Sequence, residues 1–251
     1  MPPRLFYAGF ALKTGCGIHG LFIIFGKEVF NLRRREYQKV KGFTYLEYCD
    51  YLQSKYGIGR ADYMTKSYNK NSKVSRTKDG LFAHHKKEDT AIMLSNPKFA
   101  EKHPFEWQQK ENIIYCDYLE HLLLHVLICK YPNDEAEGTV GLGGIVDYLV
   151  PELNDLYSGW IPETSWKKNC FNMVSEDEEV YLLILKQLID IWGDKPIVNN
   201  DDYTIINMFT GEPEPLINML YSSYNNKSGT WDESKNMRIY NKIKSLSPYI
   251  I

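Results

Sequence analysis

The sequence lacks the excess of positive charge that would mark a nucleic-acid-binding protein as a whole. Its 251 residues carry 30 Lys and Arg against 32 Asp and Glu, which gives a net charge of -2. Any basic contact surface must therefore be local. Cysteines are few and do not form a C-x-x-C pair. The five cysteines are Cys16, Cys49, Cys116, Cys129 and Cys170. Their odd number and wide spacing predict reduced thiols in a cytoplasmic protein, and they argue against a disulfide framework and against a four-cysteine zinc site.

A long uninterrupted apolar run is also missing. The apolar segment 5–25 contains Lys13, His19 and four glycines, whereas a membrane helix needs roughly 20 predominantly apolar residues. We expect a buried strand or helix here, with a strand at 21–25, and no insertion into a membrane. Nor is there a P-loop, because the glycines at 141–144 are not followed by the required Lys-Ser/Thr.

The chain has enough apolar residues, 43% of the total, to form a substantial core. Apolar spacing and end signals predict a mainly helical α+β protein, with helices at 44–56, 117–128, 216–224 and 231–246, and another after the capping box Ser175–Glu178. An acidic, glycine-bearing stretch at 133–144 predicts a linker. We therefore expect an N-terminal helical and strand region (1–65), a central region (66–132) and a helical C-terminal region (133–251), the last serving packing, oligomerisation or recognition of a partner.

Four of the six histidines lie between residues 84 and 125. His121 and His125 are four apart in a predicted helix, so their side chains share one face about one turn apart. Two imidazoles so placed can bind one divalent ion if a third ligand joins them. His84, at the end of an apolar run, is the obvious third, which leaves His85 free beside the metal.

The order His84-His85, Asn112, His121, His125 resembles the HNH nuclease family and is closest to its colicin-type DNase version. Asn112 precedes His121 by nine positions, as in that version, and the resemblance covers about a fifth of the chain. It implies a ββα-metal finger embedded in the helical protein, with the segment 96–109 as an inserted helical piece. It also implies a divalent cation, which the ligand types leave open as Zn, Mg, Mn or Ni.

The resemblance further implies how such a site works. Three protein ligands with an open fourth position are the arrangement expected of a catalytic metal. His85 would accept the proton of the attacking water, and Asn112 would fix the loop that aims this base. Glu88 or Asp89 could add an oxygen ligand, but we expect both to be exposed loop acids, as unpaired carboxylates usually are.

A polar, basic stretch leads into the histidine pair. Such runs are commonly solvated loops, but beside a phosphodiesterase site they would neutralise backbone phosphates. The residues that we expect to contact nucleic acid are Lys73, Arg76, Lys78, Lys86 and Lys87.

Two functions follow from these patterns. The first is a metal-dependent endonuclease that hydrolyses DNA, of the restriction or defence type found in bacteria and phages, with RNA as an open alternative substrate. The second is a non-catalytic, metal-stabilised module that binds nucleic acid or protein. A fourth metal position filled by the protein would favour the second function, whereas retention of His85 and Asn112 favours the first.

Overall fold

The computed structural model of the chain describes residues 33–136, 140–193, 216–222 and 233–246. The segment 33–40 is helical. The elements that follow are α2 (Tyr45–Tyr56), the 3₁₀ turns η1 (Ser72–Val74) and η2 (Thr77–Asp79), β1 (Phe82–His85), α3 (Pro97–Ala100), the 3₁₀ turns η3 (Phe105–Gln108) and η4 (Lys110–Asn112), β2 (Ile113–Cys116), α4 (Tyr118–Lys130), α5 (Leu142–Gly144), the π-helix η5 (Ile145–Leu149), α6 (Val150–Tyr157), α7 (Ser165–Asn172), α8 (Glu178–Trp192), α9 (Leu216–Ser222) and α10 (Glu233–Lys244).

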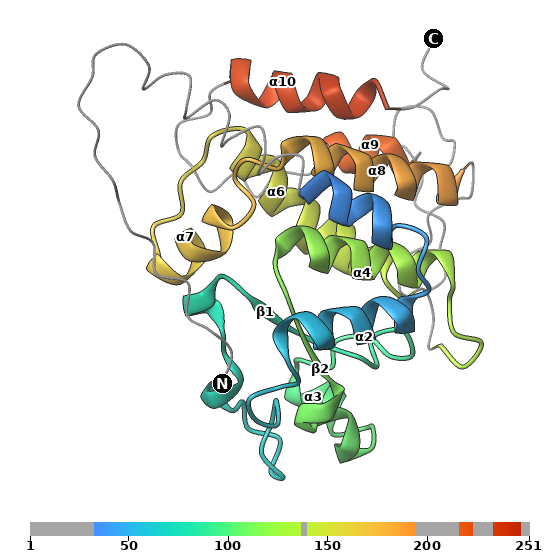
Figure 1. Cartoon of the computed structure of the whole chain (residues 1–251), viewed down its shortest axis with the longest axis vertical. Coiled ribbons are helices and arrows are strands. Elements are labelled where there is room, and N and C mark those ends of the chain that lie inside the picture. The colour runs from blue at the N-terminus through green and yellow to red at the C-terminus, as the bar shows by residue number, and fades with distance from the viewer. Residues whose placement is uncertain (1–32, 137–139, 194–215, 223–232, 247–251) are drawn as a thin grey trace, which may run out of the picture.

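Helix α4 lies in the middle of the fold. Figure 1 shows α8, α9 and α10 stacked on one side of it and α2 with the two strands on the other. The sequence predicts an apolar face for this helix, but ten of its residues are buried, and they occur all around its axis. A helix that is apolar on every side must be enclosed by other elements, and α4 is enclosed in this way. Residues on α4 are therefore held rigidly.

The strands β1 and β2 form a two-stranded antiparallel sheet, which with the helices makes the fold α+β, as predicted. In its register His84 pairs with Ile114 and His85 pairs with Ile113. The chain leaves β2 at Asp117, whose side chain accepts hydrogen bonds from the amides of Leu119 and Glu120. Asp117 thus caps α4, in a capping box with Glu120, as the sequence predicts.

The predicted helix boundaries agree with the structure for α2 and α4. The prediction of a capping box before α8 is wrong. Asp177 precedes the helix, and its side chain makes no cap hydrogen bond. It is bound instead by Arg33, whose Nε lies 3.1 Å from its carboxylate. Ser175 stays in the turn after α7, where its hydroxyl donates to the Asn172 carbonyl. A tertiary ion pair has replaced the local cap.

The predicted linker at 133–144 is only partly a linker. Its described C-terminal end is packed on α4, with Val140 and Leu142 buried. A single hydrophobic core, moreover, contains residues from all three predicted regions, such as Tyr45, Leu122 and Leu185. The strand predicted at 21–25 lies outside the described residues. None of the helices in the described ranges is long and apolar enough to cross a membrane. The described cysteines Cys49, Cys116, Cys129 and Cys170 are thiols that form no disulfide among the described residues.

Candidate metal centre

The three histidines predicted as ligands come together in space. His84 ends strand β1, and His121 and His125 face it from adjacent turns of α4. The ring centroids of His84 and His121 are 5.0 Å apart, those of His84 and His125 are 5.3 Å apart, and those of His121 and His125 are 5.0 Å apart. The end of strand β1 and two successive turns of helix α4 thus place three imidazoles around one point.

A carboxylate joins the three rings. Glu88 lies in the turn after β1, and one ligand atom from each of His84, Glu88, His121 and His125 lies within 4.8 Å of every other. The prediction that Glu88 and Asp89 are exposed loop acids is wrong, because the Glu88 side chain is only 20% exposed and Asp89 is buried. Asp89 accepts a hydrogen bond from the Thr90 hydroxyl and does not belong to the cluster. The turn folds back onto the histidines, which buries both acids.

Hydrogen bonds to the ring nitrogens that point away from the cluster orient the rings of His84 and His125. A backbone carbonyl can only accept, so Nδ1 of His125 carries a proton and donates it to the Gly141 carbonyl at 3.0 Å. The Tyr45 hydroxyl lies 2.9 Å from Nε2 of His84 and also reaches the carbonyls of His85 and Lys86. When Nδ1 of His84 holds a cation, Nε2 carries the proton and donates it to the Tyr45 oxygen, and the Tyr45 hydroxyl can then donate to one of the two carbonyls. His125 thus presents a bare Nε2 to the cluster, and Tyr45 can hold His84 in the tautomer that presents a bare Nδ1, as is common at metal-bound histidines.

Buried imidazole nitrogens without hydrogen-bond partners lie in the same place. Within the described part of the chain, Nδ1 of His84, of His121 and of the neighbouring His85 is buried and has no hydrogen-bond partner. Such atoms are rare in folded proteins and call for an explanation, of which a bound ion is one. The donor set of three imidazoles and one carboxylate fits a divalent transition metal.

The electrostatics of the cluster keep the ligands in their metal-binding forms. Burial lowers the pKa of His84 to about 4, in spite of the nearby Glu88 carboxylate. Burial also lowers the pKa values of His121 and His125. For Glu88 burial acts in the opposite direction, but His84 and the other two nearby imidazoles outweigh it and hold its pKa well below the usual value. At neutral pH the cluster contains neutral imidazoles and an ionised carboxylate, the forms that bind a metal.

Two glycines of the predicted linker, Gly141 and Gly144, pack against the His125 ring on the side away from the cluster. The carbonyl of Gly141 accepts from the ring, as described above. Gly144, in α5, lies against the ring itself: a Cβ atom at this position would come within 2.4 Å of Cε1 and 2.7 Å of Nδ1 of His125. Only glycine leaves room for the imidazole here. The C-terminal region thus contributes to the site.

His85, the predicted general base, lies beside the cluster but is fully buried. Its Nε2 is 3.1 Å from the Gln108 side-chain oxygen, and the Tyr63 ring packs against it with centroids 4.3 Å apart. Its Nδ1 is 3.4 Å from the second carboxylate oxygen of Glu88. A substrate can reach His85 only after one of these neighbours moves.

Asn112 is the last residue of η4, directly before β2, and its contacts lead toward His85 through the loop 86–112. Its side-chain amide donates to the Glu106 carbonyl at 2.7 Å, and its own carbonyl accepts from the Lys86 amide at 2.8 Å. Glu106 belongs to η3, the same short turn that presents Gln108 to His85. The segment predicted as an inserted helical piece thus supports His85 through η3.

The basic residues predicted to bind nucleic acid fall into two groups. Lys73 and Lys78 are exposed. The others have partners within the protein. Arg76 donates to the Tyr56 carbonyl and the Asp79 carboxylate, Lys86 pairs with Asp50 at 2.7 Å, and the Lys87 amine lies 5.9 Å from the centre of the Trp107 ring.

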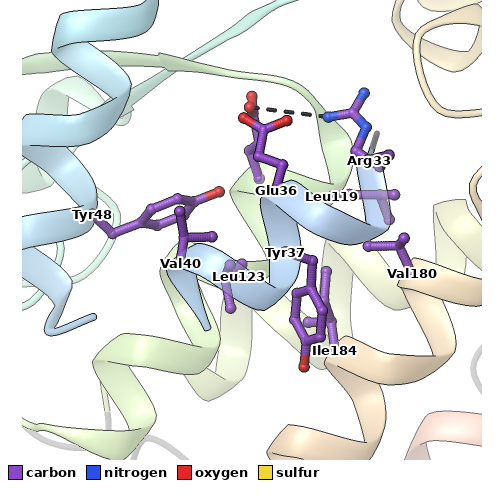
Figure 2. Close-up of a pocket in the computed structure, with 10 residues that line it drawn as sticks. Arg33, Glu36, Tyr37, Val40, Tyr48, Leu119, Leu123, Val180 and Ile184 are labelled. Atoms are coloured by element: carbon purple, nitrogen blue, oxygen red, sulfur yellow. Dashed lines mark ion pairs between the residues drawn. The ribbon is translucent and has the colours of Figure 1, made fainter. Parts of the chain in front are cut away.

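Buried ion pairs anchor the first turn of α4. The Arg33 guanidinium lies 2.6 Å from the Asp117 carboxylate and 4.0 Å from that of Glu120, and Lys55 pairs with Glu120 at 2.7 Å. Burial and the neighbouring Asp117 raise the pKa of Glu120 to about 7, although Lys55 acts against them. Arg33 and Glu120 also line a small pocket between the segment 33–40, α4 and α8, and Figure 2 shows Arg33 with the lining side chains Glu36 and Leu119. The pairs fix the end of α4 from which His121 projects.

Sequence reasoning missed the residues that support the ligands. Tyr45, Gln108, Gly141 and Gly144 carry no motif signal, because they come from α2, from η3 and from α5 with its N-cap, all outside the histidine pattern. Glu88 does carry one, since it follows His84 by four positions. Comparisons of the chain with protein-family models, curated proteins and solved structures find no match.

Proposed function

We propose that the chain is a metal-dependent phosphodiesterase of the HNH type, a nuclease that cuts DNA, in which β1, β2 and α4 form a ββα-metal finger. The observation that carries the proposal is the convergence of His84, His121 and His125 on one point with His85 next to it. The order of strand, strand and helix supports the same conclusion.

The chemistry needs a positive charge at the phosphate and a base for the attacking water. When bound, the divalent cation would supply the positive charge and polarise the scissile phosphate. His84, His121 and His125 would hold it. His85 would accept the proton of water, for which an imidazole is well suited. Asn112 and Gln108 act on His85 from the loop: the first holds the Glu106 carbonyl and the second bonds to the ring.

The nuclease proposal requires that His85 be uncovered when DNA binds. Tyr63 and Gln108 cover it from the loops 57–71 and 86–112, and the first of these loops leads into the exposed Lys73 and Lys78. Duplex DNA bound to these lysines would therefore contact the loop that covers the base. This gives the two lysines a role in positioning the nucleic-acid backbone.

The test is a cleavage assay with plasmid DNA and with single-stranded DNA and RNA as competitors, in the presence of Zn²⁺, Mg²⁺, Mn²⁺ or Ni²⁺ or of a chelator. We expect metal-dependent cutting that His85→Ala lowers by about 10²–10⁴-fold, the usual contribution of a general base. The matched control is His103→Ala, because His103 stacks on Trp107 outside the cluster, and its cutting should match that of the wild type. Equal cutting by His85→Ala and the wild type would show that the assigned base is wrong.

A second function has its own support. The Glu88 carboxylate approaches the point where a fourth ligand would lie, and His85 is buried. Both features are expected of a closed, structural metal site in a module that binds nucleic acid or protein without cutting. In the same assay, this function predicts metal binding and no cleavage of any nucleic acid with any metal.

A further inference from the structure

We propose that Glu88 is a fourth ligand of the metal, so that the resting centre is a tetrahedral site of three imidazoles and one carboxylate. The inference rests on the metal centre proposed above. It goes further by adding a ligand from the turn after β1 and by selecting the class of ion. It holds whether the protein is a nuclease or a binding module.

The distances around Glu88 have the size that tetrahedral coordination requires. Ligand atoms at 2.0–2.1 Å from a tetrahedral zinc ion lie about 3.3 Å from one another. One carboxylate oxygen of Glu88, Oε2, is 3.3 Å from Nδ1 of His84 and 3.5 Å from Nε2 of His125. The same oxygen thus lies at the edge length of a tetrahedron from two different rings.

The short contacts of Glu88 with the two rings are not ordinary hydrogen bonds. Nδ1 of His84 is buried and has no hydrogen-bond partner, although Oε2 of Glu88 is only 3.3 Å away. The proton of His125 is on Nδ1, facing the Gly141 carbonyl, so Nε2 of His125 and the Glu88 oxygen that it faces are both acceptors. Two acceptors repel each other at such a distance unless a cation lies beside them.

The place of Glu88 in the chain distinguishes it from the three histidines. It lies in a turn, whereas His84 ends a strand and His121 and His125 lie on the central helix. Its second oxygen, Oε1, is 3.4 Å from Nδ1 of His85. The carboxylate thus lies between the metal point and His85.

This ligand set selects the type of ion. Imidazole nitrogens favour zinc and its neighbours among the transition metals, whereas Mg²⁺ prefers an octahedral shell of oxygens and keeps several waters. We therefore expect Zn²⁺ or Co²⁺ in the resting protein, in preference to Mg²⁺.

The experiment measures the Zn²⁺ affinity of the full chain by competition with a chromophoric chelator, for the wild type, Glu88→Gln and Glu88→Ala. Both variants should bind Zn²⁺ about tenfold or more weakly, a loss of the size seen when a metal site is perturbed. The matched control is Asp89→Asn, the neighbouring buried acid outside the cluster, whose affinity should stay at the wild-type value. A Glu88→Gln protein with wild-type affinity would overturn the proposal.

A spectroscopic measurement on the wild type decides the question if the variants do not fold. In the Co²⁺-loaded protein, four protein ligands leave no position for an added anion, so azide should not change the visible absorption bands. Bands that shift with azide in the wild type would overturn the proposal. Neither measurement uses cleavage, so a protein that leaves DNA intact would disprove the nuclease and leave this inference standing.

Discussion

At the scale of single residues, the side chains that orient the three histidines matter as much for metal binding as the histidines themselves. Tyr45 is buried on α2, and its hydroxyl is hydrogen-bonded to Nε2 of His84. This bond holds the ring with Nδ1 toward the cluster. A tyrosine hydroxyl from a distant element thus does what a carboxylate or carbonyl does at many metal-binding histidines.

Replacement of Tyr45 by Phe should weaken metal binding without disturbing the ligands. The change leaves Nε2 of His84 buried without an acceptor, so the ring loses its fixed tautomer. We expect a ten- to hundredfold loss of Zn²⁺ affinity and a loss of about 1 kcal/mol in the free energy of unfolding of the metal-free protein. Competition with a chelator and urea denaturation measure the two quantities.

The control for this variant is Tyr51→Phe. The Tyr51 hydroxyl donates to Glu36 at 2.8 Å and does not contact the histidines, so its loss should leave the metal affinity unchanged. If the two tyrosine variants bind Zn²⁺ equally well, Tyr45 does not set the tautomer of His84.

At the scale of elements, the contact between α4 and α5 is the least expected part of the site. Gly144 in α5 packs against the His125 ring, and Gly141 supplies a carbonyl to it. A π-helix, η5, follows directly, and such irregular turns occur frequently at functional sites. The C-terminal region therefore helps to orient a ligand that lies in the central region.

Gly144→Ala should displace the His125 ring. The new Cβ atom would lie within 3.0 Å of three ring atoms, closer than side chains approach in folded proteins, so the ring or α5 must shift. We expect a loss of Zn²⁺ affinity of about tenfold or more, measured by chelator competition.

Gly143→Ala is the matched control in the same short helix. Its Cβ atom would meet only an Asp147 carboxylate oxygen, at 3.7 Å, which is an ordinary contact. Its metal affinity should equal that of the wild type. A Gly144→Ala protein that behaves like Gly143→Ala would show that the contact with Gly144 does not position His125.

At the scale of the whole molecule, the candidate metal site lies where separate parts of the fold meet. The cluster connects the end of β1, the turn after it and the central helix α4. Since α4 is enclosed by both halves of the single core, an ion bound here links the small sheet to the helical body.

Removal of the metal should therefore lower the stability of the entire chain. Binding to the folded state alone adds about 2.7 kcal/mol to the free energy of unfolding when free Zn²⁺ is at 100 times its Kd. For a chain of this size, this is a rise in Tm of about 5–10 °C, which calorimetry with Zn²⁺ or with a chelator would measure. His121→Ala, which lacks one ligand, should show a much smaller rise. A wild-type Tm that does not respond to Zn²⁺ would contradict the metal centre.

Much of the fold that holds the site could be predicted because it depends on local signals. Helical spacing and a capping box predict α4 from Asp117 onward, and with it the shared face of His121 and His125. Where a tertiary contact competes with a local signal, the prediction fails. Asp177 binds Arg33 instead of capping α8, and the acids after β1 fold inward instead of facing water.

The sequence by itself determined the order and spacing of the histidines, the helix that carries two of them and the α+β class, because periodicity and capping act between residues a few positions apart. Only the tertiary structure decided that Glu88 joins the cluster, that Tyr45 and Gly141 fix two of the rings, and that His85 is covered. The reason is separation along the chain: Tyr45 is 39 positions from His84, and Gly141 is 16 positions from His125. Such contacts form only when the elements pack around a common core, and no local pattern encodes them.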